Sequence, residues 1–220
     1  MRVFRNVNSV LNSNTYILCD DYEAGVYVID PGDSAPIFEW LISNKKSLAG
    51  IILTHTHYDH IFGVNDLLDS YPDSLLYVDN LMHEGLFSVK LNTSLYHEKP
   101  YVLKKQFDQN FVFLEERVKY PLWNSVYFSI ISTPGHTKDC ISINIEKYLF
   151  CGDALIPGLK VYKVKGSDPI AIVNSIERIC TTFPEDTLLM PGHGAGCLLS
   201  DLRAVKEFNR LDYSAKFSEI

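Results

Sequence analysis

The apolar run Gly50–Leu53, which ends in a cluster of histidines, is the feature that most restricts the fold of this chain. A continuous apolar run of this length is typical of a strand buried on both faces, and such strands belong to parallel sheets covered by other layers. The segment Thr54–His60 follows at once and contains three histidines and one aspartate. Because ligands in open α/β sheets bind outside the carboxyl ends of strands, these side chains stand where an α/β protein places a site.

The spacing within this segment predicts how its side chains lie. In extended backbone His55 and His57 project to the same side, because side chains alternate with a period of two. We expect a helix over Tyr58–Ser70, with Asp59 and His60 in its first turn, pointing back toward the same pocket. One short peptide could then serve two adjacent metal ions.

Three further candidate ligands follow other expected strands. They are His136, Asp153 and His193, and each has a glycine next to it in the sequence, which lets the backbone approach a site closely. A lone His or Asp beside glycine is usually a turn or surface residue, but chance is a poor explanation for seven such residues at strand ends. Because no thiolate is among them, the set suits Zn(II), Fe(II) or Mn(II).

The rest of the chain indicates an α/β protein. No linker or low-complexity segment divides it, so we expect one domain over residues 1–220. The expected strands are Val3–Val7, Asn14–Cys19, Gly25–Asp30, Leu75–Val78, Ser125–Ser132, Ile141–Ile145, Tyr148–Cys151 and Leu188–Met190. The expected helices begin after Ser34 and Asp168 as N-caps, each with a proline in its first turn, and a last helix covers about Ser200–Tyr213.

Residues 80–120 lack a clean period and mix polar residues with aromatics that look exposed: Phe87, Tyr96, Tyr101 and Phe107. We interpret this stretch as a long excursion, since loops of this length are usually functional lids or disordered segments. His83 and His97 lie in it, and we expect surface or lid roles for them rather than metal ligation.

Composition limits the partners. The formal charge of −7 has the wrong sign for binding phosphate backbones over a broad surface, so nucleic acid is not expected. Residues 1–6 do not resemble a secretory signal, and no apolar run approaches the roughly 20 residues that cross a bilayer. Five cysteines, an odd number without a Cys-x-x-Cys pair, indicate a reducing compartment. We therefore expect a cytoplasmic protein that acts on a small molecule and has no membrane partner.

The His-x-His-x-Asp-His run, followed by a His, an Asp and a His in that order, resembles the metallo-β-lactamase superfamily over nearly the whole chain. The resemblance implies a four-layer αβ/βα sandwich with a binuclear metal site at one edge. It assigns His55, His57 and His136 to one metal, Asp59, His60 and His193 to the other, Asp153 to a bridge between them, and Asp30 to a supporting role behind the ligands.

Within that superfamily the chain is most similar to glyoxalase II-like thioesterases, through Thr133–Thr137, Gly152–Leu155 and Pro191–Gly194. The lactamases mostly carry Cys at the position of Asp153, which disfavours lactam hydrolysis here. Two features depart from glyoxalase II. Because only residues 194–220 follow His193 in this sequence, we do not expect the helical domain that helps bind glutathione, and the Gly-Arg-x-Asp element after the bridging Asp is missing.

The residues that replace this element include four candidates for substrate binding, Lys160, Tyr162, Lys163 and Lys165. They could clamp an anionic substrate tail. An equally good interpretation is a solvated strand or loop with alternating lysines.

The resemblance implies hydrolysis with two divalent ions, zinc first and iron or manganese as alternatives. A bridging hydroxide, oriented by Asp59, would attack the carbonyl of a small thioester or ester. Three alternatives stay open: a persulfide dioxygenase with one Fe(II) on His55, His136 and Asp153; a lactonase with the same metal ligands; and a degenerate, non-catalytic binding domain. A tRNA-processing nuclease is not expected, because the chain has no basic arm.

Overall fold

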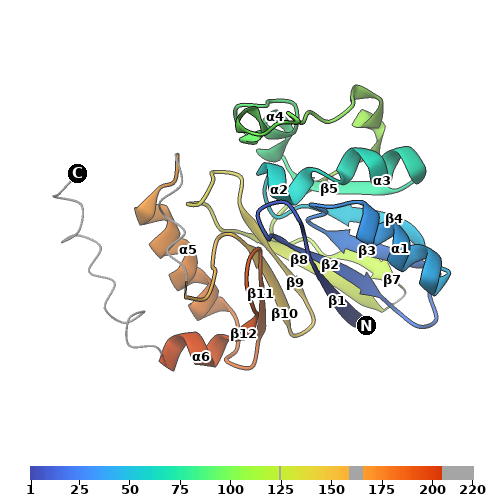
Figure 1. The fold of residues 1–220 in the computed structure, drawn as a ribbon. Coiled ribbons are helices and arrows are strands. Elements are labelled where there is room, and N and C mark those ends of the chain that lie inside the picture. Colours follow the sequence, from blue (N-terminus) through green and yellow to red (C-terminus); the bar gives the residue numbers. More distant parts are fainter. Residues whose placement is uncertain (124, 159–165, 205–220) are drawn as a thin grey trace.

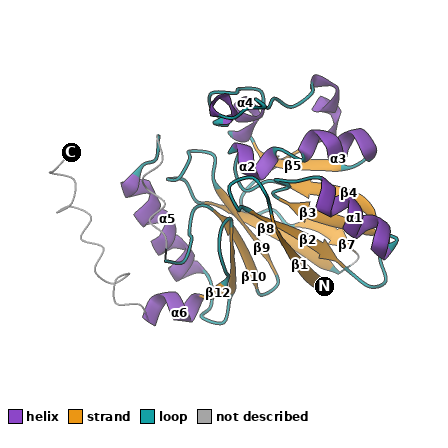
Figure 2. Cartoon of the chain, viewed as in Figure 1, coloured by secondary structure: helices purple, strands orange, loops and turns teal. Residues whose placement is uncertain are grey.

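Two six-stranded sheets lie face to face and carry helices on their outer faces in the computed structural model, which describes residues 1–123, 125–158 and 166–204. In Figures 1 and 2, α5 and α6 flank one sheet and α1 and α3 flank the other. The expected αβ/βα sandwich is therefore confirmed. Within the described ranges, no helix is both long enough and apolar enough to cross a membrane.

The first sheet has the order β1-β2-β3-β4-β5-β6. The first three strands, all expected from the sequence, form an antiparallel meander, and β3 to β6 run parallel. The bounds are β1 (Arg2–Val7), β2 (Asn14–Cys19), β3 (Gly25–Ile29), β4 (Ser47–Ile52), β5 (Leu75–Asp79) and β6 (Phe111–Leu114). Strand β4 contains most of the apolar run that predicted a buried parallel strand, and Ile51, Ile52 and Leu53 are fully buried.

Helix α1 (Ala35–Asn44) connects β3 to β4 and has the expected proline in its first turn. Ser34 stands at its N-cap, but the side chain does not cap the helix. Its hydroxyl donates to Oδ2 of Asp66 at 2.7 Å instead. Ser34 therefore stands at the N-cap position, as expected. The expected capping hydrogen bond is absent, because the hydroxyl binds a carboxylate of α3 instead.

The single helix expected over Tyr58–Ser70 is wrong: the segment forms α2 (Tyr58–Ile61) and α3 (Val64–Ser70). In a continuous helix the N–H of Gly63 would donate to the carbonyl of Asp59. Here the Asp59 carbonyl accepts from the Ser13 hydroxyl at 2.7 Å, and Gly63 N–H donates to the Pro31 carbonyl at 2.8 Å. Two contacts from distant segments thus replace one helical hydrogen bond and break the helix.

The expected irregular excursion over residues 80–120 contains more regular structure than its sequence indicates. It forms α4 (Met82–Leu86), two 3₁₀ helices (Ser94–Tyr96 and Lys105–Asn110), β6, and β7 (Tyr120–Trp123). Of the aromatics expected to be exposed, Tyr101 and Phe107 are buried, whereas Tyr96 is 68% exposed. Strand β6 was missed because it is an edge strand without alternating polarity, whose four residues are all apolar and mostly half-buried or exposed.

The second sheet has the order β12-β11-β10-β9-β8-β7, in which only β10 and β11 pair in parallel. The remaining bounds are β8 (Val126–Ser132), β9 (Ile141–Ile145), β10 (Tyr148–Gly152), β11 (Leu188–Pro191), β12 (Cys197–Leu198), α5 (Pro169–Thr182) and α6 (Leu199–Ala204). Asp168 caps α5 as expected, since its Oδ1 accepts from the N–H groups of Ile170 and Ala171. The end of the helix expected over Ser200–Tyr213 lies outside the described residues.

Alternation along β10 divides the core. Phe150 belongs to the large cluster between the sheets and meets Tyr16 edge to face, with 5.1 Å between ring centroids. Leu149 and Cys151 belong to a second cluster with α5 and α6. At the sheet edge after β4, the N–H of Ile141 donates to the carbonyl of Thr54 at 2.9 Å. This bond joins the two sheets beside the histidine-rich segment.

Candidate metal centre

The structure brings all seven predicted ligands to one edge of the sandwich. Two follow β4, two lie in α2, and the others lie between β8 and β9, after β10, and after β11. In that order they are His55 and His57, Asp59 and His60, His136, Asp153, and His193. Six of the seven are buried, and the His193 side chain is 20% exposed. The sequence prediction that strand ends gather these residues is thus met by the geometry.

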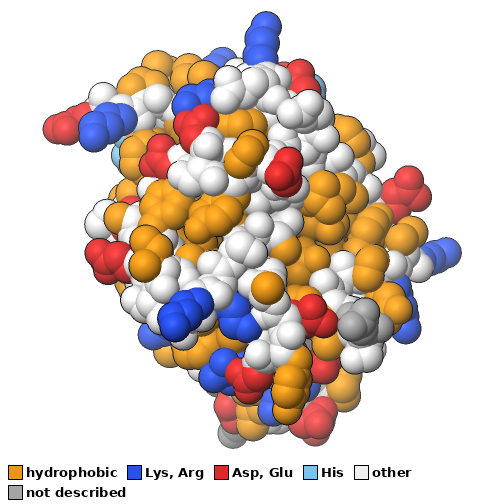
Figure 3. Space-filling model, turned by 90° about the vertical axis from the view of Figure 1, so that its right-hand side faces the viewer, with side chains coloured by type: hydrophobic (Ala, Val, Ile, Leu, Met, Phe, Trp, Pro, Cys, Tyr) orange, Lys and Arg blue, Asp and Glu red, His pale blue; other side chains and the backbone are white. Residues whose placement is uncertain are grey.

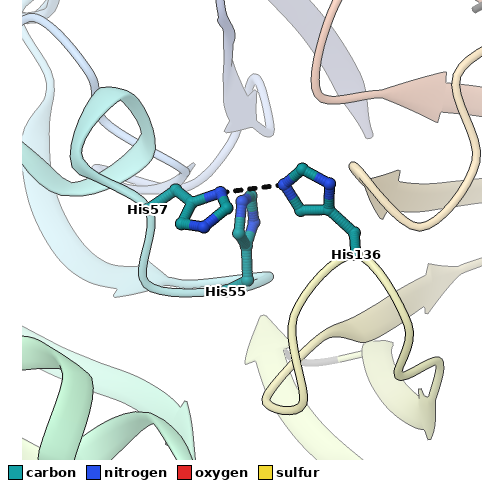
Figure 4. Close-up of side chains that lie close together, drawn as sticks. All are labelled: His55, His57 and His136. Atoms are coloured by element: carbon teal, nitrogen blue, oxygen red, sulfur yellow. Dashed lines mark hydrogen bonds between the residues drawn. The ribbon is translucent and has the colours of Figure 1, made fainter. Parts of the chain in front are cut away.

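His55, His57 and His136 form what we call the three-histidine group (Figure 4). One ligand atom from each lies within 4.8 Å of the others. Nε2 of His136 is 2.8 Å from Nδ1 of His57. Burial, together with the neighbouring His136, lowers the pKa of His57 to about 4, and burial with His60 lowers that of His55. The imidazoles of His55 and His57 are therefore neutral near pH 7, which is the form that binds metal ions.

Asp59, His60 and His193 form a second cluster, the Asp59 group. Oδ2 of Asp59 is 3.1 Å from Nε2 of His193 and 3.4 Å from Nε2 of His60. Burial alone would lower the pKa of both imidazoles, but Asp59 and Asp153 raise it to about 9 for His60 and about 10 for His193. In the absence of metal, protons on these rings balance the two carboxylates.

Asp153 lies between the two groups. Its Oδ2 is 3.4 Å from Nε2 of His136 and 3.5 Å from Nε2 of His193, and its Oδ1 is 3.5 Å from Nε2 of His60. Although burial alone would raise the pKa of this carboxyl, His60 and the other surrounding histidines hold it well below its ordinary value. Asp153 is therefore a carboxylate that lies next to histidines of both groups.

Unsatisfied polar atoms indicate that this donor set fits a divalent cation. Nε2 of His55, Nε2 of His60 and Oδ1 of Asp153 are buried and make no hydrogen bond to any described residue. Buried polar atoms in native proteins nearly always have a partner, and one explanation of an exception is an ion. Nitrogen and oxygen donors without thiolate match the ligand preferences of Zn(II), Fe(II) and Mn(II).

Asp30 lies behind the ligands, as expected. Its Oδ2 is 3.1 Å from Nδ1 of His60, and its carboxylate accepts from the N–H and the hydroxyl of Thr54 at 2.8 and 2.5 Å. The Thr54 hydroxyl is in turn 3.1 Å from Nδ1 of His55. These contacts orient both rings so that Nε2 remains for a metal, which is the usual role of a carboxylate next to a ligating histidine.

One glycine is required by packing at the centre. A Cβ atom on Gly192 would lie 2.1 Å from Oδ1 of Asp153 and 2.8 Å from Cε1 of His60. No larger residue fits there without displacing the ligands. The sequence argument that glycine permits close approach therefore holds at this position.

Several supporting residues were missed. The Thr56 hydroxyl donates to Oδ2 of Asp139 at 2.6 Å, and both residues are buried beside the three-histidine group. The ring of His97 stacks on Tyr58 with 4.3 Å between centroids. Neither contact leaves a signal in the sequence, because the partners are far apart along the chain. His83 packs on Phe87 and Phe111 instead of joining either candidate group.

The four candidate substrate-binding residues cannot be placed. Lys160, Tyr162, Lys163 and Lys165 lie outside the described residues. Their part in binding stays a prediction.

Comparison with known proteins gives a consistent assignment. Residues 8–193 match the family model of the metallo-β-lactamase superfamily. A probable metallo-hydrolase of Streptococcus pyogenes serotype M6 is 30% identical over 200 residues, which cover 88% of this chain and 84% of the relative.

Solved structures show the same fold. The BLEG-1 B3 metallo-β-lactamase has a TM-score of 0.81 at 25% identity, with 90% of this chain and 95% of that chain covered. TTHA1623 in a di-iron-bound form has a TM-score of 0.73 at 25% identity, with 90% and 96% covered. ETHE1 from Myxococcus xanthus has a TM-score of 0.69 at 20% identity, with 93% and 82% covered. The chain belongs to the metallo-β-lactamase superfamily.

Proposed function

We propose that the protein is a binuclear-metal hydrolase of a small thioester or ester, similar to glyoxalase II. The observation that carries this proposal is the position of Asp153, whose two oxygens lie 3.4–3.5 Å from histidines of both groups. A carboxylate placed this way can be shared by two ions. A mononuclear centre would leave the carboxylate and the imidazoles of the Asp59 group without a ligand role.

The proposed metal ligands follow from the two groups. One ion would be held by His55, His57 and His136, the other by Asp59, His60 and His193, with Asp153 common to both. We propose zinc as the first choice. Iron is supported as an alternative by the di-iron form of TTHA1623, and manganese suits the same donors.

When bound, two divalent ions would lower the pKa of a water toward neutrality and polarise the substrate carbonyl. Asp59 is the proposed catalytic residue, because its carboxylate lies among the candidate ligands, 3.1 Å from Nε2 of His193, and interacts electrostatically with Asp153. Burial alone would raise the pKa of Asp59, but His60 and His193 lower it, so that the carboxyl is ionised and is a weak base. Asp59 would therefore orient the attacking water more than it removes a proton from it.

A centre in which Asp59 orients water but is a weak base favours a thioester as the substrate. A thiol has a pKa of roughly 8.5, so a thiolate leaves without a strong general acid, whereas an alkoxide or amine needs one. The pKa values of Asp59 and Asp153 are both lowered by the surrounding histidines, so neither carboxyl would act as that acid. A thioester of a small acid is the substrate class that this site serves best.

The expected partner is a small, anionic molecule. The formal charge of −7, together with the mixture of Lys and Arg with Asp and Glu side chains on the face in Figure 3, disfavours a nucleic acid as the partner. Lys160, Tyr162, Lys163 and Lys165 remain the proposed contacts for the anionic group. A cytoplasmic location is part of the proposal and depends on the odd number of cysteines without a Cys-x-x-Cys pair.

The experiment is a hydrolysis screen on metal-repleted protein over thioesters, lactones, phosphodiesters and a β-lactam, with metal content measured on the same sample. We expect two ions per chain and the highest kcat/KM on a thioester. Turnover of lactones alone would replace the thioesterase by a lactonase. One iron per chain with no hydrolysis would favour the dioxygenase, and metal without any turnover would favour a binding domain.

A matched pair of variants checks the site. The double variant His57→Ala, Asp59→Ala should lose at least about a hundredfold in kcat/KM, since it removes one ligand from each group. His83→Ala, which changes an exposed histidine outside both groups, should retain the wild-type value. Full activity in the double variant, or less than one bound transition metal per chain, would refute the hydrolase.

A further inference from the structure

We propose that Ser13 and Asn14, in and directly after the turn between β1 and β2, are positioning residues for the Asp59 group alone. Through them this turn would set the affinity of one metal ion and leave the three-histidine group unchanged. The inference rests on the proposed binuclear function and adds to it a means by which the two ions bind and leave separately.

Ser13 holds the backbone of Asp59. Ser13 is fully buried, and its hydroxyl donates to the Asp59 carbonyl at 2.7 Å. The hydroxyl oxygen of Ser13 also accepts a hydrogen bond from Nδ2 of Asn8 at 2.9 Å. The bond replaces the helical hydrogen bond that would otherwise run from Gly63 to Asp59. Ser13 therefore fixes where α2 ends, and with it the direction of the Asp59 and His60 side chains.

Asn14 holds the segment that carries His193. Its Nδ2 donates to the carbonyls of Pro191 and Gly194, each at 2.9 Å, and its backbone N–H donates to the carbonyl of Gly192 at 2.6 Å. Ser13 and His193 also form an isolated antiparallel bridge. The fully buried Asn14 side chain thus binds the backbone both before and after His193.

Different residues hold the three-histidine group. The Thr56 hydroxyl between His55 and His57 donates to Asp139, and the loop that carries His136 is tied to α5. There Asp168 N–H donates to the Gly135 carbonyl, and the Ser175 hydroxyl donates to the Pro134 carbonyl, each at 2.7 Å. The turn between β1 and β2 therefore contacts the segments of the Asp59 group, whereas Asp139 and α5 contact the segments that carry His55, His57 and His136.

The two supports make opposite predictions for matched variants. Ser13→Ala and Thr56→Val each remove one buried hydroxyl donor beside the centre. Loss of such a supporting contact typically weakens metal binding by about 10- to 100-fold. We expect Ser13→Ala to weaken zinc binding by the Asp59 group by that factor, and Thr56→Val to weaken zinc binding by the three-histidine group. Asn14→Ala, which removes the contacts with Pro191 and Gly194, should act like Ser13→Ala.

The measurement is a zinc titration of the full chain labelled with ¹⁵N in its histidines, followed by the imidazole nitrogen signals. These signals show which rings bind zinc at each concentration, independently of turnover. For the wild type we expect both groups to saturate at two zinc ions per chain. In Ser13→Ala the His60 and His193 signals should require a higher zinc concentration, and those of His55, His57 and His136 should not change. Thermal unfolding without metal identifies a variant that fails to fold. If Ser13→Ala or Asn14→Ala fails to fold, the remaining one of these two variants tests the inference.

Equal weakening of both groups in Ser13→Ala, or an unchanged Asp59 group in both turn variants, would overturn the inference. Fewer than two zinc ions in the wild type would instead refute the proposed function. The turn is then tested in the metal-free spectra: Ser13→Ala must shift the His60 and His193 signals more than those of His57 and His136, and the reverse order contradicts the inference.

Discussion

Oδ2 of Asp30 lies 3.1 Å from Nδ1 of His60, while Nε2 of the same ring faces Asp59 and Asp153. Asp30 has a φ of +51°, a left-handed conformation that Asp and Asn tolerate better than most residues. The carboxylate also accepts two bonds from Thr54, whose hydroxyl meets His55. One residue outside the predicted ligand set therefore orients a histidine in each group.

The Asp30→Asn variant should bind both zinc ions about 10- to 100-fold more weakly, because the amide cannot replace the carboxylate as acceptor for both Thr54 and His60. Asparagine keeps the positive φ accessible, so the fold should persist. Asp33→Asn is the matched control, since Asp33 lies in the same loop and bonds to Ser9 instead. Zinc retained after dialysis against graded chelator measures the effect, and equal retention in the two variants would contradict it.

Gly192→Ala should abolish tight binding of zinc by the Asp59 group and lower activity at least about a hundredfold. The added Cβ would lie 2.1 Å from the Asp153 carboxylate, so a ligand must move. Gly194→Ala is a control two residues away. It has a φ of +73° and nothing within 4 Å of its Cβ, so it should cost only about 1–2 kcal/mol in the free energy of unfolding. Metal content and kcat/KM should separate the two variants; similar values would show that steric contact with Asp153 is irrelevant.

Proton release should distinguish the two metal groups. In the absence of metal the pKa values of His60 and His193 are raised to about 9 and about 10, so both rings are protonated at pH 7. Zinc binding there must displace about two protons, whereas His55 and His57, whose pKa values are both lowered, that of His57 to about 4, should release almost none. Calorimetric titration at pH 7 in buffers of different ionisation enthalpy measures the number of protons that are released when each zinc ion binds. The same number for both events would contradict the assignment.

The metal-free chain should become less stable at alkaline pH. A histidine whose pKa is raised in the folded state contributes stability that is complete below its unfolded value of about 6.5 and is lost as pH rises through the folded value. For His60 and His193 this loss should occur near pH 9 to 10. Urea unfolding at pH 7 and pH 10 measures it. The loss should be smaller in Asp59→Asn, because that carboxylate supports both imidazolium ions; an equal loss would point to other titrating groups.

The sequence predicted the ligand cluster because the signal for each residue is its position relative to a neighbouring strand, which can be recognised from adjacent residues. Five of the seven residues lie in segments that follow a recognisable strand, the other two lie in the helical turn α2, and the carboxyl ends of neighbouring strands meet at one edge of a sheet. The break between α2 and α3 was not predictable from the sequence, because it depends on Ser13, 46 positions before Asp59. The bond between Thr56 and Asp139 spans 83 positions and has the same character. Contacts of this kind arise only when the two sheets pack.

The central claim is that one carboxylate joins two metal groups, and diffraction from a zinc-loaded crystal tests it most directly. Anomalous scattering at the zinc edge should show two peaks, one among His55, His57 and His136, the other among Asp59, His60 and His193, each bonded to Asp153. A single peak held by His55, His136 and Asp153, with the Asp59 group empty, would contradict the binuclear centre and the hydrolase built on it.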